Sequence, residues 1–70
     1  MNEYYVEVVD RREDDTEEVK VDFYRYSTSV YPVVKEAYKN AEKGDVIIIK
    51  ETSSGVVWET EAITDGKDWN

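Results

Sequence analysis

Cysteine, histidine and leucine are all missing from this chain of 70 residues. Without cysteine there is neither a disulfide framework nor a thiolate metal site, which excludes a small disulfide-rich secreted protein and a zinc finger. The lack of both histidine and cysteine removes the usual general base and the usual activated nucleophile of enzymes. We therefore expect a protein that is not an enzyme.

Long apolar runs are missing as well. No stretch approaches the roughly 20 residues that a membrane-spanning helix needs. The first five residues lack the basic and then apolar pattern of a signal peptide. These features predict a soluble, cytoplasmic protein that does not bind membranes.

Basic residues are few compared with acidic ones. The chain has 17 Asp and Glu against 9 Lys and Arg, which gives a formal net charge of −8. A negative charge of this size argues against direct binding of nucleic-acid phosphates or anionic lipids. The expected partner is a protein, with a neutral or basic surface.

The apolar residues that are present favour strands. Eleven of them are valine, and β-branched side chains fit a pleated, half-buried surface. A chain of this length buries only about 60% of the surface that it exposes when unfolded. The composition therefore predicts one domain with a single core.

Alternating side chains predict two strands, over 3–10 and 19–26, and the polar segment 11–18 between them predicts a hairpin turn. On the first strand, one side carries Tyr4, Val6 and Val8, and the other side Tyr5, Glu7 and Val9. On the second strand, we expect one side to carry Val19, Val21 and Phe23, and the other Lys20, Asp22, Tyr24 and Tyr26.

A helix is predicted over 30–43. The segment 27–29 (Ser-Thr-Ser) offers N-cap oxygens, Pro32 suits a first helical turn, and Gly44 suits the position after the last turn. Apolar residues at helical spacing form one stripe, which consists of Val30, Val33, Val34, Ala37, Tyr38 and Ala41.

Two further strands are predicted over 45–51 and 56–63, with a turn at 52–55 between them. The order strand, strand, helix, strand, strand predicts a single α+β domain of ββαββ type over 1–63. Its helix covers one face of a four-stranded sheet made of two hairpins. The residues 64–70 have no period and are expected to form a flexible tail, in which Trp69 either folds back on the domain or anchors a partner.

This element order, with the helical segment VYPVVKEAYKNAEKG between two hairpins, resembles the β-grasp domains of the protein G and protein L type. The resemblance spans 3–63 and consists of element order alone, so it transfers immunoglobulin binding to no residue. It implies that the first and last strands are adjacent in the centre of the sheet. An order with the third strand inside stays open, because DVIIIKE at 45–51 is very apolar for an edge strand.

Carboxylates are the remaining side chains that could take part in catalysis or bind a metal. Glu59 and Glu61 on one strand face would stand about 6.6 Å apart, but they are more typical of the solvated face of a strand. The acidic turn with Asp14 and Asp15 lacks the Asp-x-Asp-x-Asp-Gly spacing of a calcium loop. We therefore expect no cofactor and no bound metal.

The most informative feature is a surface. If Val6 and Val21 face the helix, the opposite sheet face carries Tyr5, Val9, Tyr24, Tyr26, Val57 and either Ile47 or Ile48. A contiguous aromatic patch on a small domain indicates a binding surface, although cross-strand stabilisation explains such tyrosines equally well. The predicted contact residues are Tyr5, Tyr24, Tyr26, Glu59 and Glu61, with the Asp14–Asp15 turn as a second site.

These features predict a module that binds a basic protein surface and blocks it. In size, acidity and missing catalytic residues, the chain resembles inhibitors encoded by phages and mobile elements, including anti-restriction and anti-CRISPR proteins, which act in the cytoplasm of the host cell. The alternatives are a homodimer that pairs through the exposed sheet face or through an edge at 46–50, an immunoglobulin-binding-like module, and an enzyme that uses carboxylates alone.

Overall fold

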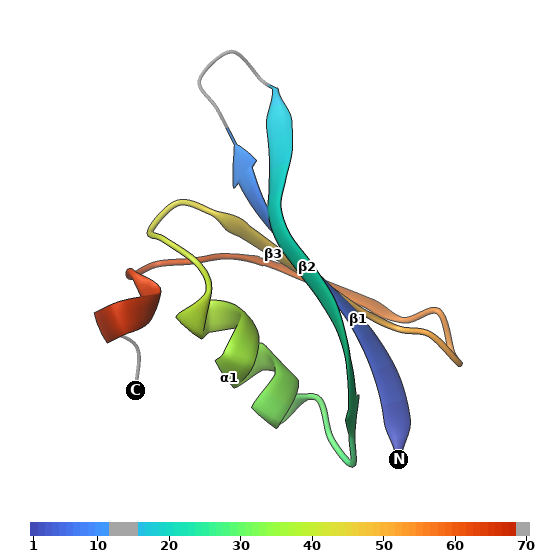
Figure 1. Ribbon diagram of the computed structural model, residues 1–70. Helices are drawn as coiled ribbons and strands as arrows, with labels where there is room; N and C mark the ends of the chain where they lie inside the picture. Colours follow the sequence, from blue (N-terminus) through green and yellow to red (C-terminus); the bar gives the residue numbers. More distant parts are fainter. Residues whose placement is uncertain (12–15, 69–70) are drawn as a thin grey trace.

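The structure, a computed structural model, describes residues 1–11 and 16–68. Its elements are β1 (Asn2–Arg11), β2 (Glu17–Ser27), α1 (Tyr31–Lys39), β3 (Val46–Glu51), β4 (Val57–Glu61) and the short 3-10 helix η1 (Gly66–Asp68). The four strands form one sheet, and Figure 1 shows α1 on one side of it. The predicted α+β fold with ββαββ order is confirmed.

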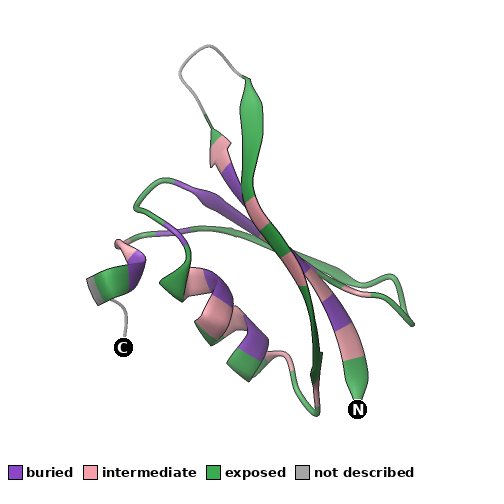
Figure 2. Ribbon diagram, viewed as in Figure 1, coloured by how far each residue is buried: buried purple, intermediate pink, exposed green. Residues whose placement is uncertain are grey.

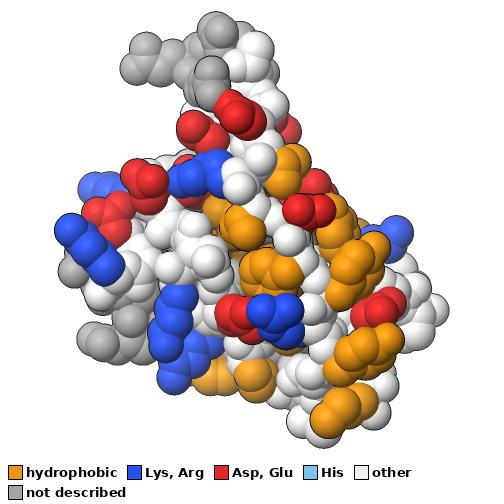
Figure 3. All heavy atoms as spheres, in the orientation of Figure 1, with side chains coloured by type: hydrophobic (Ala, Val, Ile, Leu, Met, Phe, Trp, Pro, Cys, Tyr) orange, Lys and Arg blue, Asp and Glu red, His pale blue; other side chains and the backbone are white. Residues whose placement is uncertain are grey.

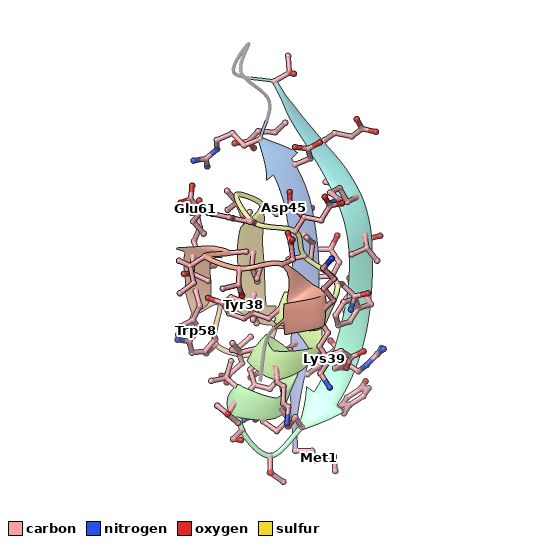
Figure 4. The ribbon with its side chains drawn as sticks, turned by 90° about the vertical axis from the view of Figure 1, so that its left-hand side faces the viewer. Met1, Tyr38, Lys39, Asp45, Trp58 and Glu61 are labelled. Carbon is pink, nitrogen blue, oxygen red and sulfur yellow. The ribbon has the colours of Figure 1, made fainter. Side chains whose placement is uncertain are left out.

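All neighbouring strands are antiparallel, and their order is β2-β1-β3-β4. Figure 4 shows β4, which carries Trp58 and Glu61, at one edge of the sheet. The β-grasp arrangement with the first and last strands in the centre is therefore wrong, and the order with the third strand inside is confirmed. The physical reason is that the more apolar strand takes the central position, where it is shielded from water. Three of the six residues of β3 are buried, whereas every residue of β4 is exposed. The segment 46–50 is consequently no edge, and it is not available for pairing with a second copy.

The core lies between α1 and the sheet face that α1 covers, which we call the covered face (Figure 2). The alternation predicted for β1 and the apolar stripe predicted for the helix are both confirmed, because their residues meet in this core. The fully buried members of the core cluster are Tyr4, Val6, Val8, Val33, Ala37, Ala41, Ile47, Ile49 and Ala62. No helix among the described residues is long and apolar enough to cross a membrane.

The helix starts without the predicted side-chain cap. Its N-cap residue is Val30, and Ser27 instead accepts a hydrogen bond from the backbone N–H of Ser29 at 3.3 Å. Pro32 stands in the first turn, as predicted, where its missing N–H costs no hydrogen bond. The start of the helix thus depends on proline and on packing of the apolar stripe.

The helix ends at Lys39 and not, as predicted, at Lys43. One long-range and one local hydrogen bond take backbone groups that would continue it. The carbonyl of Ala41 accepts the N–H of Gly66 at 2.7 Å, and the N–H of Glu42 donates to the Asp45 carboxylate at 2.8 Å. Both partners, Gly66 and Asp45, lie outside the predicted helix. The spacing of apolar residues within 30–43 carries no sign of these bonds, so it overestimates the length of the helix.

The pairing of β1 with β2 contains a bulge at Lys20. Val8 pairs with Val21 and Val9 with Val19, so that Lys20 has no partner on β1. The predicted sides of Val19 and Lys20 are therefore wrong. The Lys20 ammonium contacts Oδ2 of the buried Asp45 at 2.7 Å, and Val19 lies on the face opposite the helix.

The described part of the C-terminal segment makes hydrogen bonds to the residues that follow α1. Asp65 accepts a hydrogen bond from the N–H of Lys43 at 2.9 Å, and the N–H of Gly66 donates to the carbonyl of Ala41. A Cβ atom on Gly66 would lie 2.4 Å from the carbonyl oxygen of Tyr38, so only glycine fits this contact. Trp69 lies outside the described residues.

Candidate functional site

The candidate site is the sheet face opposite α1, which we call the open face. Among the described helices, α1 packs on the covered face and η1 contacts α1, so neither packs on the open face. Residues that are paired in register share a face. We call each set of residues paired across the sheet a row and give it in the strand order β2, β1, β3, β4. The rows of the open face are Tyr26 and Glu3; Tyr24, Tyr5, Lys50 and Val57; Asp22, Glu7, Ile48 and Glu59; Val19, Val9, Val46 and Glu61; and Glu17 with Arg11.

The three tyrosines predicted as contact residues lie together at one end of the open face. Tyr5 and Tyr24 are directly opposite each other, with ring centroids 4.8 Å apart and planes tilted by 39°. Tyr24 is 57% exposed and Tyr26 is 68% exposed. Figure 3 shows exposed hydrophobic side chains along β2, with acidic side chains between them. The tyrosines therefore offer aromatic surface to a partner.

Carboxylates hold the hydroxyl groups of two of these tyrosines. The Tyr5 hydroxyl donates to Oδ2 of Asp22 at 3.0 Å, and this hydrogen bond is the main reason why the pKa of Tyr5 rises to about 12. Loss of solvent contact and the nearby charge of Glu7 raise the same pKa further. A hydrogen bond to Glu3 raises the pKa of Tyr26. Each hydroxyl is thus directed to a carboxylate at neutral pH.

Negative charge dominates the open face, whose rows contain six carboxylates and two cations. Glu7 lies directly opposite Asp22, an arrangement of like charges that destabilises a sheet. Glu59 is partly neutralised, since Arg11 Nη2 lies 3.8 Å from its Oε1. This ion pair joins β1 to β4 and thus spans β3.

The structure brings only some of the predicted site residues together. Glu59 lies one row away from the Tyr5–Tyr24 pair, and Glu61 lies two rows away. Both are on the open face as predicted, but neither is adjacent to the tyrosines. Asp14 and Asp15, the second predicted site, lie outside the described residues.

Several residues of the open face were missed by the sequence reasoning, and Lys50 is the one beside the aromatic pair. Lys50 lies between Tyr5 and Val57, where it places a cation next to the aromatic pair. The alternation of β3 contains the signal, because Lys50 is two residues from Ile48 and shares its face. The signal could be used only once Ile48, and not Ile47, was known to face away from the helix.

The far end of the open face is packed only on its two central strands. Val9 and Val46 are 4% and 3% exposed, although neither belongs to the core under the helix. They are paired with each other and lie beside the ion pair that spans β3. On the outer strands of the same row, Val19 is 48% exposed and Glu61 is exposed as well.

Outside the open face, the described residues offer few features that could hold a small ligand. In the described part of the chain, no group of His, Cys, Asp or Glu is arranged to hold a metal ion. A depression of about 280 Å³ lies at the end of α1, lined by Ala41, Glu42, Asp65, Gly66 and Lys67. Its volume is just below the roughly 300 Å³ at which ligand pockets begin.

Comparisons of the chain with protein-family models, with curated proteins and with solved structures found no match.

Proposed function

We propose that this protein is a non-enzymatic module that binds one partner protein stoichiometrically and blocks a surface of it with the open face. The observation that carries the proposal is the exposure of Tyr24 and Tyr26 on a sheet face that no other described element covers. Contiguous exposed aromatic surface is typical of binding sites, and tyrosine is enriched among the residues that dominate binding energy.

The charge of the open face supports a basic partner. Six carboxylates against two cations repel acidic surfaces and attract basic ones. Proteins that bind nucleic acids carry such basic surfaces. The specific form of the proposal is therefore an inhibitor of a nucleic-acid-handling protein, of the anti-CRISPR or anti-restriction type, which acts in the cytoplasm of the host cell.

Self-association through the open face is the second candidate, because a copy of the chain could bury the same tyrosines. It is less favoured, since two such faces would bring their excess carboxylates together. The immunoglobulin-binding alternative loses its basis, because the sheet order differs from that of the β-grasp domains.

The test compares the wild type with Tyr24→Ser/Tyr26→Ser and with a control, Tyr31→Ser. Tyr31 is 63% exposed but lies on α1, away from the open face. We expect the wild type and the control to capture a partner from a host lysate, and the double variant to lose it. The partner is then identified, purified and mixed with each protein to confirm a complex of defined stoichiometry.

Light scattering on each purified protein separates the two candidates. A monomer that captures a partner through the tyrosines supports the inhibitor proposal. If the wild type is a dimer that captures no partner, and Tyr24→Ser/Tyr26→Ser is a monomer, the inhibitor proposal is contradicted. That result establishes self-association. Equal loss of the partner in Tyr31→Ser would also contradict the assignment of the open face.

A further inference from the structure

We infer that the tyrosine end of the open face binds arginine side chains of its partner, and that Tyr5, Tyr24, Glu7 and Asp22 form the site for one guanidinium group. We call these four residues the arginine site. The inference rests on the proposed function and specifies the chemistry that the partner must present.

The four residues have the geometry that a guanidinium requires. Tyr5 and Tyr24 form one cross-strand pair, and Glu7 and Asp22 form the next pair on the same face. Two residues along a strand correspond to about 6.6 Å. Guanidinium is planar, so it stacks on an aromatic ring while its N–H groups donate to a carboxylate. An arginine on the rings therefore reaches the carboxylates of the next row.

The chain already contains this combination elsewhere. The guanidinium carbon of Arg25 lies 4.6 Å from the ring centroid of Phe23. Its Nε donates to Glu36 at 2.8 Å, and its Nη2 also contacts that carboxylate. Arg25, Phe23 and Glu36 thus form a complete set of cation, aromatic ring and carboxylate.

The arginine site has the rings and the carboxylates of such a set but lacks the cation. The nearest cation of the face, Lys50, makes no ion pair with a described residue, and Arg11 is engaged by Glu17 and Glu59. Glu7 has no ion-pair or hydrogen-bond partner within 1–11 and 16–68, and it faces Asp22. A cation supplied by the partner would relieve the repulsion between these two carboxylates.

A second copy of the chain that pairs through its open face is a poor source of this cation. Among the described residues of that face, Arg11 is already engaged by two carboxylates, and the other cation, Lys50, is not an arginine and is outnumbered by six carboxylates. Charge complementarity therefore selects a basic partner of different sequence over self-association.

The test uses the full chain and three short peptides, acetyl-Gly-Arg-Gly-Arg-Gly-amide and its versions with lysine or citrulline in place of arginine. Binding is followed by NMR chemical shifts of the backbone amides. We expect the arginine peptide to shift the amides around the arginine site and to bind at least about three-fold more tightly than the lysine peptide. The citrulline peptide, which has no charge, should not bind measurably.

Variants locate the binding. Glu7→Gln and Asp22→Asn should each weaken binding of the arginine peptide about five-fold, which corresponds to roughly 1 kcal/mol for an exposed pair. Lys50→Gln should tighten binding, because it removes a competing cation. The matched control is Glu42→Gln, which changes the net charge equally but lies after α1, where Glu42 contacts Lys20. This control should bind as the wild type does.

Two results would overturn the inference. One is equal affinity for the lysine and arginine peptides, and the other is an equal loss of affinity in Glu42→Gln, which would indicate general attraction by net charge. A folding defect does not mimic the expected result, because Glu7→Gln should raise the melting temperature by removing a like-charge pair.

The experiments distinguish a failure of arginine recognition from a failure of the proposed function. If the arginine peptide does not bind but partner capture is still lost in Tyr24→Ser/Tyr26→Ser and kept in Tyr31→Ser, the binding module stands and arginine recognition is refuted. If the peptide binds as predicted but the open-face variant captures its partner as well as the wild type does, the proposed function is refuted.

Discussion

The two faces of the sheet use alternate residues of the same strands in different ways. On β1, Tyr4, Val6 and Val8 are almost completely buried under α1, whereas Tyr5 and Glu7 between them face outward. The covered face contains the main core cluster, while the open face tolerates two carboxylates directly opposite each other. Stability is thus concentrated on one face, while the other face carries exposed tyrosines and carboxylates.

The difference in stability between the two faces is tested most directly by truncating neighbouring isoleucines of β3. Ile49 is 2% exposed on the covered face, and Ile48 is half-buried on the open face. We expect Ile49→Ala to lower the free energy of unfolding by about 2–5 kcal/mol, because it leaves a cavity in the core. Ile48→Ala should lower it by less than about 1.5 kcal/mol, since that site leaves no closed cavity. Urea unfolding measures both, and equal losses would refute the difference between the faces.

The next largest effect is expected at Asp45, on the covered side. It is 4% exposed, pairs with Lys20 and accepts the N–H of Glu42. Asp45→Ala should lower the free energy of unfolding by about 2 kcal/mol, less than for a fully buried pair because Lys20 is partly exposed. Glu42→Gln, which changes the exposed partner of the same lysine, is the control and should change stability little.

The docking of η1 is tested by Gly66→Ala. The added Cβ would meet the backbone at the end of α1, where Tyr38 and Lys39 carbonyl oxygens lie 2.4 and 2.6 Å away. We expect a loss of about 1–2 kcal/mol as the segment shifts, together with faster hydrogen exchange of the Gly66 neighbours. Lys67→Ala, at the adjacent exposed position, should have almost no effect. Similar exchange in both variants would contradict the contact.

The smallest effect concerns the open face and its response to pH. The pKa of Tyr5 is raised from 10.0 to about 12, mainly by its hydrogen bond to Asp22. A raised pKa in the folded state means that the associated stability is complete below pH 10.0 and is lost as the pH rises through about 12. Ultraviolet titration of the wild type should show late ionisation of Tyr5 and also of Tyr26, whose pKa is raised by Glu3. Asp22→Asn should shift the ionisation of Tyr5 toward lower pH, whereas Glu59→Gln should leave it unchanged.

Much of the candidate site follows from local pattern. The alternation of β1 and β2 places Tyr5, Tyr24 and Tyr26 on one face, and the apolar stripe of the helix indicates which face is covered. Lys50 could not be placed in the same way, because its neighbours depend on the position of β3 in the sheet. The Asp14–Asp15 prediction falls on residues that the structure does not describe.

The sequence by itself determined the number and order of the elements, the apolar side of β1 and of α1, and the excess of negative charge, because these depend on local periodicity and composition. Only the tertiary structure decided three other features, namely the central position of β3, the bulge at Lys20 and the end of α1 at Lys39. Each of them depends on partners distant in the chain. β3 is placed by its pairing with β1, Lys20 contacts Asp45, and Gly66 bonds to the end of the helix. Periodicity carries no information about such contacts, because it reports the environment of a residue along its own element and not the identity of its partner.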